Sequence, residues 1–263
     1  MIAQRYKDML SGKSVIRQIS EWSTARGTEI GYENVFDYSL GNPSVPCPEH
    51  FTKTCIDLLQ TKEPVTLHGY SPTLTIPAVR KAVAESLNRR FGMDYTADHI
   101  FMTTGAAGAL AHAVRCVGVP GQNIVTFAPF FPEYKPYIEG AGLTLRVTPP
   151  RCADFQIDFE AFAQLVDENT AAVLINSPNN PSGTAYSEET LQELADFLTA
   201  TSAKYGHHIF LISDEPYREI SFGGRVTPYP AKFYDDTLTC YSFSKSLSVP
   251  GERIGYVAAN PRC

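Results

Sequence analysis

The sequence predicts an α/β protein with a seven-stranded, mostly parallel sheet and helices on both of its faces. Three observations lead to this class. Seven short apolar runs, rich in residues that favour strands, follow residue 98. Most of these runs are nearly continuous in hydrophobicity, which is typical of strands covered on both faces. Helical patterns separate several of them, and this alternation favours parallel strands joined by right-handed crossovers.

The predicted strands are short and evenly distributed along the chain. They are 99–104 (HIFMTT), 123–128 (NIVTFA), 143–148 (LTLRVT), 171–176 (AAVLIN), 208–213 (HIFLIS), 239–244 (TCYSFS) and 254–259 (IGYVAA). The last two are separated only by a loop over 245–253, which is too short for a helical crossover. One strand of this pair is therefore expected to be antiparallel.

The predicted helices show apolar residues at three- and four-residue spacing. They cover 48–64, 77–92, 106–118 and 187–206, with LHGYSPTLT as a loop between the first two. Ser187 stands before the last of these helices and predicts its amino-terminal cap. Residues 1–46 are expected to form a helix and an arm, separate from a main domain over 47–263.

The composition excludes several classes of protein. The chain has 263 residues, 43% hydrophobic and 19% charged, which is ample for a large core. A net charge of -6 gives no basic surface for nucleic acid or an anionic membrane. No apolar run has the length of a signal peptide or a membrane span, so we expect a cytoplasmic protein. The six cysteines and six histidines lack ligand spacing, which predicts free thiols and no metal site.

Two loops follow predicted strands at the edge where open parallel sheets bind ligands. In TTGAAGAL (103–110), Ala106 and Ala107 begin a helix whose N–H groups suit a phosphate, although a tight turn needs the same small residues. In NSPNNPSG (176–183), two prolines and a glycine pin a loop that suits the placement of one side-chain donor, or forms a rigid turn.

An acidic residue and a lysine follow two further strands at this edge. Asp214, in ISDEPY, lies near the core boundary, where a carboxylate needs a cation or strong donors; capping of the next turn is the alternative. Lys245 stands at the end of a buried strand, where burial lowers its pKa and frees a neutral amine, although a lysine in a surface salt bridge is ordinarily commoner. Ser242, Ser244 and Arg253 surround it with donors suited to a phosphate. This combination suggests pyridoxal phosphate on a Schiff-base lysine.

The segment SFSKSLSVPGERIG (242–255) resembles the lysine signature of the class I/II, aspartate-aminotransferase-like pyridoxal-phosphate enzymes of fold type I. NSPNNPSG and SDEPY are similar to two other hallmark segments of that family, in the same order and at similar spacings. The resemblance implies the large, cofactor-binding domain of that fold over 47–263, with an arm and part of the small domain over 1–46. It also implies that the C-terminal small domain, with its arginine for the substrate carboxylate, is absent.

The resemblance assigns roles to the residues that match the family's motifs. Lys245 would form the Schiff base and move a proton between the substrate Cα and the cofactor. Asp214 would pair with the pyridine nitrogen. Asn180 and Tyr217 would hydrogen-bond the phenolic oxygen of the ring.

The remaining matches concern the phosphate, the substrate and a second subunit. The backbone of Ala106 and Ala107, with Ser242, Ser244 and Arg253, would hold the phosphate. Phe131 matches an aromatic that stacks on the cofactor ring, or is a core phenylalanine. Gly41 and Asn180 would approach the substrate. Tyr70 would reach the phosphate of a neighbouring subunit, which implies a homodimer.

The resemblance implies an aminotransferase that moves an amino group from an L-amino acid to a 2-oxo acid by a ping-pong mechanism. Other outcomes of the same substrate carbanion stay open, namely C–S lysis, decarboxylation and racemisation, because all of them need the same lysine. A truncated, inactive cofactor-binding fragment is a further alternative. A cofactor-sensing transcription regulator would carry a basic helix-turn-helix ahead of the domain, and nothing before YSLGNP is long or basic enough.

Overall fold

The structure is a computed structural model that describes residues 4, 7, 15–72 and 76–263. By its internal contacts the chain divides into two units, Met1–Ser44 and Val45–Cys263. The first unit contains α2 (Val15–Ile30), whose Gly27 leaves room for the Tyr32 ring, since a Cβ there would lie 2.5 Å from it. No helix among the described residues has the length and apolar character to cross a membrane.

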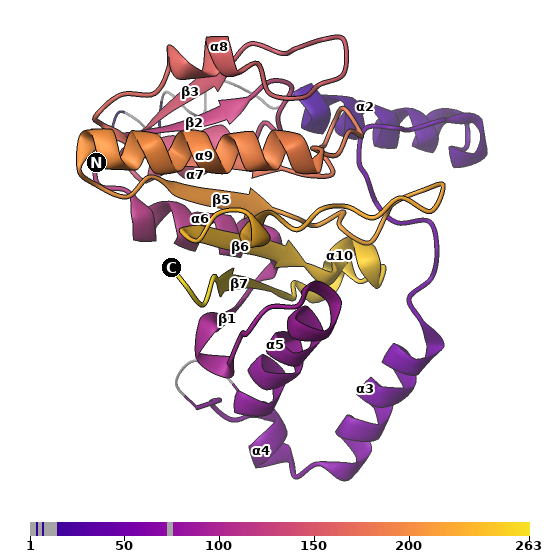
Figure 1. Ribbon diagram of the computed structural model, residues 1–263. Helices are drawn as coiled ribbons and strands as arrows, with labels where there is room; N and C mark the ends of the chain where they lie inside the picture. The colour runs from indigo at the N-terminus through magenta and orange to yellow at the C-terminus, as the bar shows by residue number, and fades with distance from the viewer. Residues whose placement is uncertain (1–3, 5–6, 8–14, 73–75) are drawn as a thin grey trace. The chain divides into compact units, whose positions relative to one another are not determined.

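Seven strands of the described chain form one sheet, as the sequence predicts. They are β1 (Ile100–Thr103), β2 (Asn123–Phe127), β3 (Thr144–Thr148), β4 (Thr170–Asn176), β5 (Phe210–Asp214), β6 (Thr237–Ser242) and β7 (Gly255–Ala259). Their order across the sheet is β1-β7-β6-β5-β4-β2-β3 (Figure 1). β7 is antiparallel to both of its neighbours and the other pairs are parallel, so β7 is the expected antiparallel strand.

The larger unit also contains eight described helices. They are α3 (Glu49–Thr61), α4 (Pro64–His68), α5 (Pro77–Phe91), α6 (Gly105–Val117), α7 (Tyr134–Gly140), α8 (Phe159–Ala163), α9 (Glu188–Tyr205) and α10 (Phe243–Ser246). The hydroxyl of Ser187 accepts a hydrogen bond from the Thr190 N–H, which confirms the predicted cap of α9. The predicted loop over 67–75 is wrong in part, because its first two residues belong to the short helix α4; residues 73–75 lie outside the described part of the chain. Pro64 begins α4, where its fixed φ suits a first helical position.

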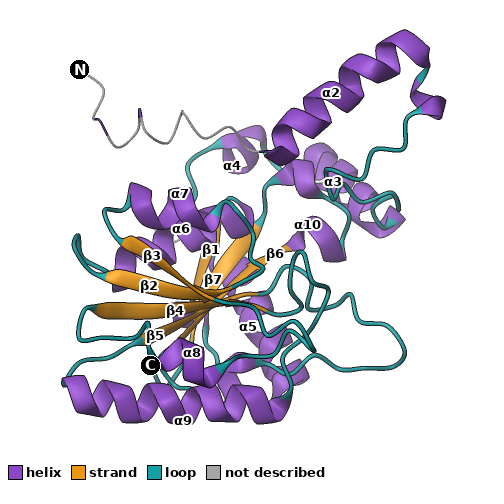
Figure 2. Cartoon of the chain, turned by 90° about the horizontal axis from the view of Figure 1, so that it is seen from above, coloured by secondary structure: helices purple, strands orange, loops and turns teal. Residues whose placement is uncertain are grey.

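Helices cover both faces of the sheet, and alternate strand residues contact the two layers. Leu174 and Ile212 pack against α6 and α7, whereas Val173 and Leu211 pack against α8 and α9. Helix α5 packs on the same face as α8 and α9, against Tyr241 and its neighbours at the other end of the sheet. Figure 2 shows α6 and α7 on one side of the strands and α8 and α9 on the other.

The sixth predicted strand continues too far along the sequence. β6 ends at Ser242, and Phe243–Ser246 forms the helix α10, so Lys245 lies in a helix rather than at a strand end. The Ser242 hydroxyl accepts a hydrogen bond from the Ser244 N–H and thereby caps α10. The apolar run hid this boundary, since Phe243 is as compatible with a strand as the residues before it.

Candidate active site

The register of the sheet gathers the candidate residues at the carboxyl edge of its parallel strands. Ser242 and Thr103, at the ends of β6 and β1, both pair with Gly255 at the start of β7. Asp214, at the end of β5, pairs with Asn176 at the end of β4. The segments that follow these strands, including α10, therefore meet at one edge, where ligands bind to sheets of this kind.

Lys245 lies half-buried on α10, directly after β6. Burial lowers the pKa of its ammonium group from 10.5. Its Nζ lies 5.9 Å from the centre of the Tyr217 ring, which places the amine beside the segment that follows β5. A lysine with a lowered pKa has a larger neutral, nucleophilic fraction at ordinary pH than an exposed one.

Asp214 is fully buried, and its two carboxylate oxygens have different surroundings. The Tyr134 hydroxyl donates to Oδ2 at 2.6 Å, whereas Oδ1 has no hydrogen-bond partner among the described residues. Burial raises the pKa of Asp214 to about 7, an effect that the Tyr134 hydrogen bond opposes. A buried carboxylate with one unpaired oxygen is costly, so Oδ1 is suited to a cationic N–H donor on a ligand.

Tyr134 is a site residue that the sequence did not reveal. It is the first residue of α7, it is completely buried, and it reaches Asp214 across a separation of eighty residues. Its aromatic character alone predicts a core position, and no nearby motif marks its hydroxyl. The general need of a buried tyrosine hydroxyl for a hydrogen-bond partner is the one property of Tyr134 that points to a polar contact.

Asn176 holds the asparagine loop against β5. Its side-chain amide donates to the Asp214 carbonyl at 2.9 Å, and its Oδ1 accepts from the Asn180 N–H at 2.6 Å. The Asn180 amide in turn donates to the Tyr217 hydroxyl at 3.3 Å. The structure thus brings Asn180 and Tyr217 together, and the buried Asn176, another residue that the sequence did not single out, sets their spacing.

The start of α6 and Arg253 form the part of the site suited to an anion. The first turn of a helix presents N–H groups without intrahelical acceptors, and here it comprises Gly105, Ala106 and Ala107. Arg253 donates through Nη2 to the Thr104 carbonyl at 3.3 Å and through Nη1 to the Pro250 carbonyl at 2.9 Å. The guanidinium therefore lies at the N-terminus of α6. The guanidinium and the free N–H groups of the helix both favour a negatively charged ligand there.

Two glycines make this close approach possible. Gly105 has φ +77°, and a Cβ there would lie 2.8 Å from the Arg253 guanidinium. Gly255 is needed because a Cβ would contact the Tyr241 carbonyl and lie 2.7 Å from the Gly105 backbone. Side chains at either position would separate β7 from the start of α6.

The two candidate serines lie at the same edge but contact one another. Their hydroxyl oxygens are 2.7 Å apart, and the Ser242 hydroxyl donates weakly to the Ile254 carbonyl at 3.5 Å. A phosphate oxygen would compete with that carbonyl for the Ser242 proton. Ser244 is buried behind this contact, so its role at a phosphate stays a prediction.

The remaining candidates differ in how the structure places them. Phe131 is half-buried and packs against the core cluster that contains Tyr134, with the two ring centres 5.8 Å apart. Tyr70 is fully exposed, and Gly41 belongs to the unit Met1–Ser44. The roles of these two residues at the substrate and at a second subunit stay predictions. Among the described residues, no three metal-ligating side chains are grouped so that they could hold an ion.

The residues present fit pyridoxal phosphate. The unpaired Asp214 Oδ1 suits a protonated ring nitrogen, and the N-terminus of α6 with Arg253 suits a dianionic phosphate. The Asn180 amide and the Tyr217 hydroxyl suit a phenolate oxygen between these ends. Lys245 carries the amine that an aldehyde requires.

A mixed sheet with a lysine-bearing helix at its carboxyl edge is the architecture of the fold type I transferases, to which the structural neighbours of the chain belong. The model of the family "Aminotransferase class I and II" matches residues 33–263. The chain therefore belongs to the class I and II aminotransferase family.

Individual relatives show how much of such a protein the chain covers. An amino transferase from Eubacterium rectale has a TM-score of 0.95 and 43% identity, over 100% of this chain and 66% of that one. A "probable aspartate/prephenate aminotransferase" of Aquifex aeolicus is 32% identical over 89% of this chain and 59% of its own length. An S-alkyl-thiohydroximate lyase of Arabidopsis thaliana is 34% identical over 84% of this chain and 47% of its own length. The chain thus spans about half to two thirds of these relatives.

Replacement of Tyr134 by phenylalanine is expected to raise the pKa of Asp214 further. The lost hydrogen bond favours the ionised carboxylate, and a bond of this kind is worth about one pKa unit or more. Urea unfolding of the cofactor-free protein between pH 4 and 9 measures the effect, because stability stops falling with pH only above the pKa of the folded state. Tyr186→Phe, which removes a buried hydroxyl on the other face of the sheet, is the control. Identical pH profiles for the two variants would rule out the assigned hydrogen bond.

Proposed function

We propose that the protein is a pyridoxal-phosphate-dependent aminotransferase that moves an amino group from an L-amino acid to a 2-oxo acid by a ping-pong mechanism. One observation carries this proposal. A fully buried carboxylate with an unpaired oxygen, Asp214, lies at the same sheet edge as Lys245, a lysine whose pKa is lowered by burial. This pair suits a cofactor with a cationic ring nitrogen and an aldehyde.

When bound, pyridoxal phosphate supplies an aldehyde for the amino group and a ring that accepts electrons from the substrate Cα. Lys245, with its lowered pKa, would hold the aldehyde in the resting protein and would carry the proton to and from the substrate Cα. Asp214 keeps the proton on the ring nitrogen. Asn180 and Tyr217 donate to the phenolic oxygen, which they reach as a hydrogen-bonded pair.

Other residues position the cofactor at this edge of the sheet. The N–H groups of Ala106 and Ala107, the Ser242 hydroxyl and the Arg253 guanidinium hold the phosphate, with Ser244 supporting Ser242. Phe131 would pack against the ring. Residues 47–263 thus act as the cofactor-binding domain, and residues 1–46 as an arm and part of a small domain, from which Gly41 approaches the substrate.

A direct assay tests the proposal. The names of the relatives make aspartate the first amino donor to try, with 2-oxoglutarate as acceptor. We expect glutamate to form in proportion to consumption of the donor, and no ammonia. Failure of every donor to yield glutamate, while the protein binds the cofactor, would contradict transamination.

C–S lysis is the second candidate, because one relative of similar identity is named as an S-alkyl-thiohydroximate lyase. The same lysine and carboxylate serve both reactions, so the site described above does not separate them. A cysteine conjugate in place of aspartate distinguishes them. Ammonia, pyruvate and a thiol indicate lysis, whereas glutamate indicates transfer.

We further propose a homodimer in which Tyr70 of one subunit completes the phosphate site of the other. The full exposure of Tyr70 supports this, since a tyrosine without cover in one chain suits contact with a second. Mixing Lys245→Ala and Tyr70→Ala subunits, each nearly inactive alone, should restore about a quarter of the wild-type activity through hybrid dimers. A mixture that stays as inactive as its parents would exclude a shared site.

A further inference from the structure

A second set of interacting side chains lies on the opposite face of the sheet from Asp214. Along β6, Cys240 packs in the same cluster as Tyr134, whereas Tyr241, the next residue, packs with α5 in the other layer. Five side chains connected on this side form what we call the back-face network. Its members are Glu215, Arg218, Glu219, Tyr241 and Ser246.

Arg218 is the centre of the back-face network. Its side chain is only 2% exposed, and it donates to Glu215 Oε2 and to the Tyr256 hydroxyl, both at 2.9 Å. Its Nε lies 3.5 Å from Glu219 Oε1. The guanidinium also stacks on three aromatic rings, the closest being Tyr241 at 4.5 Å. A buried cation held in this way has little freedom to move.

A chain of hydroxyl groups extends the network from Glu219 to α10. The Tyr241 hydroxyl donates to Glu219 Oε2 at 2.9 Å and lies 2.7 Å from the Ser246 hydroxyl. A phenol has one proton, so the Ser246 hydroxyl is the donor in the second bond. Arg90 of α5 donates to the other oxygen of Glu219 at 2.7 Å, which ties this carboxylate to α5 as well.

Three members of the back-face network each follow a cofactor-site residue directly in the sequence. Glu215 follows Asp214, Arg218 follows Tyr217, and Ser246 follows Lys245. Asp214 and Tyr217 lie on the segment after β5, whereas Lys245 lies on α10 after β6. The network is therefore a side-chain connection between two separate segments that carry the candidate catalytic groups.

We propose that the back-face network positions the lysine, the carboxylate and the tyrosine of the active site relative to one another, with Arg218 joining the β5 segment and the Glu219–Tyr241–Ser246 bonds holding α10. Replacement of a buried ion pair by well-packed apolar residues is often neutral or stabilising, so stability alone does not account for a buried arginine here. Misplacement of catalytic groups by about 1 Å costs about 100-fold in rate, which gives the network a function. Only the expected effect on the reaction rate rests on the proposed function.

A matched pair of substitutions tests the proposal. Tyr241→Phe removes the hydroxyl that holds Ser246 and keeps the ring under Arg218. Tyr95→Phe removes a hydroxyl from a tyrosine of the same buried cluster, whose partner is the Tyr229 hydroxyl at 2.8 Å and not α10. Ser246→Ala removes the other end of the tested bond with a smaller change in packing, and it decides the question if Tyr241→Phe folds poorly.

The first readout is made on the cofactor-free chain and does not depend on any enzymatic activity. The Leu247 N–H bonds the Phe243 carbonyl across α10, so its hydrogen exchange reports how firmly that helix is held. We expect about tenfold faster exchange in Tyr241→Phe and in Ser246→Ala, no further increase in the double variant, and no change in Tyr95→Phe. The rate of chemical labelling of the Lys245 amine, followed against pH, should also show a higher pKa for this amine in the first two variants. The reason is that a loosened α10 exposes the amine and removes the burial that lowers its pKa.

The second readout is turnover of the cofactor-loaded protein, where Tyr241→Phe and Ser246→Ala should lower kcat about tenfold with a smaller change in KM. Equal exchange at Leu247 in Tyr241→Phe and Tyr95→Phe would overturn the proposal. If the wild-type chain binds no cofactor, the proposed function fails, whereas the exchange result still decides whether the network holds α10.

Discussion

Replacement of Lys245 by alanine is expected to abolish turnover, with a loss of about 10³-fold or more, and to remove the visible absorbance of the bound cofactor. The side chain is the half-buried amine with a lowered pKa at the carboxyl edge, beside Tyr217. It has two functions in the proposed reaction, holding the aldehyde and moving the proton at the substrate Cα. Activity with aspartate and the spectrum of the loaded, dialysed protein measure the two effects separately.

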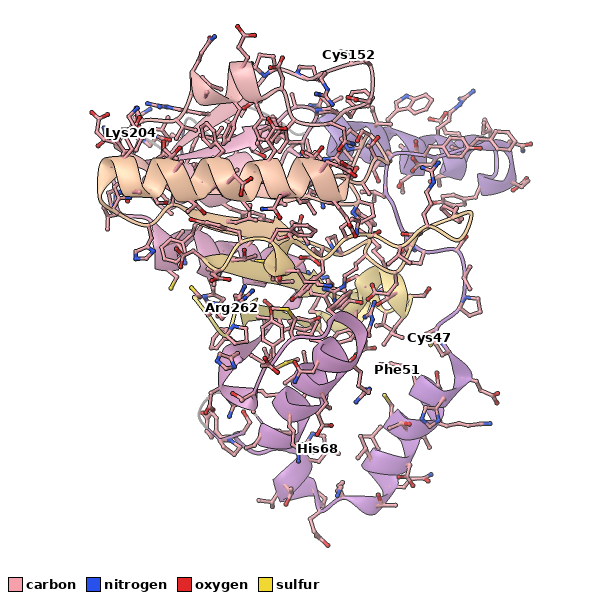
Figure 3. The ribbon with its side chains drawn as sticks, viewed as in Figure 1. Cys47, Phe51, His68, Cys152, Lys204 and Arg262 are labelled. Carbon is pink, nitrogen blue, oxygen red and sulfur yellow. The ribbon has the colours of Figure 1, made fainter. Side chains whose placement is uncertain are left out.

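Lys204→Ala is the control for this experiment. Lys204 lies exposed near the end of α9 (Figure 3). Helix α9 packs on the face of the sheet opposite the Tyr134 cluster, to which Asp214 is bonded. This variant should keep both the spectrum and the activity. Retention of the absorbance band by Lys245→Ala would show that another lysine binds the aldehyde, and the assigned site would then be wrong.

Replacement of Asp214 by asparagine is expected to lower turnover by about 100- to 1,000-fold, the range for loss of one preorganised electrostatic group. Asparagine keeps the shape and can still accept from Tyr134, but it carries no negative charge to hold a proton on the ring nitrogen. Cofactor binding should weaken less than turnover, because the phosphate contacts at α6 and Arg253 remain. The measurements are kcat and the dissociation constant of the cofactor, each compared between the variant and the parent protein.

The same substitution has an opposite effect on the stability of the cofactor-free chain. Burial raises the pKa of Asp214 from 3.8 to about 7, so the folded chain keeps a proton that the unfolded chain loses. The stability that this proton provides is fully present below about pH 4 and is lost as the pH rises towards 7. The loss amounts to about 4 kcal/mol. Asp214→Asn lacks this loss and should therefore be the more stable protein at pH 8.

Urea unfolding at pH 4 and pH 8 measures this linkage. The stability difference between Asp214→Asn and the parent should move in favour of the variant by several kcal/mol between the two pH values. Asp154→Asn, at an exposed ion pair with Arg151, should show no comparable change. If the stability of the parent protein did not fall between pH 4 and pH 7, the pKa of Asp214 would not be raised by burial, and this prediction would be wrong.

The seven strands could be predicted from the sequence because each is a compact apolar run covered on both faces. The boundary at Ser242 could not, since Phe243 continues the apolar run and a single serine cap marks the start of α10. The short helices α4, α7 and α8 were also missed. Helices of five to seven residues have too few turns to establish a period, and tertiary contacts decide whether they form.

The candidate site could be predicted as far as its residues lie in local motifs. Asp214 ends β5, Asn180 and Lys245 lie shortly after β4 and β6, and parallel strands deliver such residues to one edge. Arg253 reaches the same edge because it precedes β7, which runs antiparallel to β6. The Tyr134–Asp214 bond and the Tyr241–Ser246 bond depend on which side chains the fold brings together. Tyr134 is eighty residues from its partner, and a buried tyrosine gives no sign in the sequence of where its hydroxyl donates.

The covalent attachment of the cofactor is the most direct test of Lys245 as the Schiff-base lysine. The chain is loaded with pyridoxal phosphate, reduced with borohydride, digested and analysed by peptide mass spectrometry. We expect a pyridoxyl phosphate group on the Lys245 side chain, and on no other lysine at equal stoichiometry. Modification of a different lysine, or no modification of the loaded protein, would contradict it.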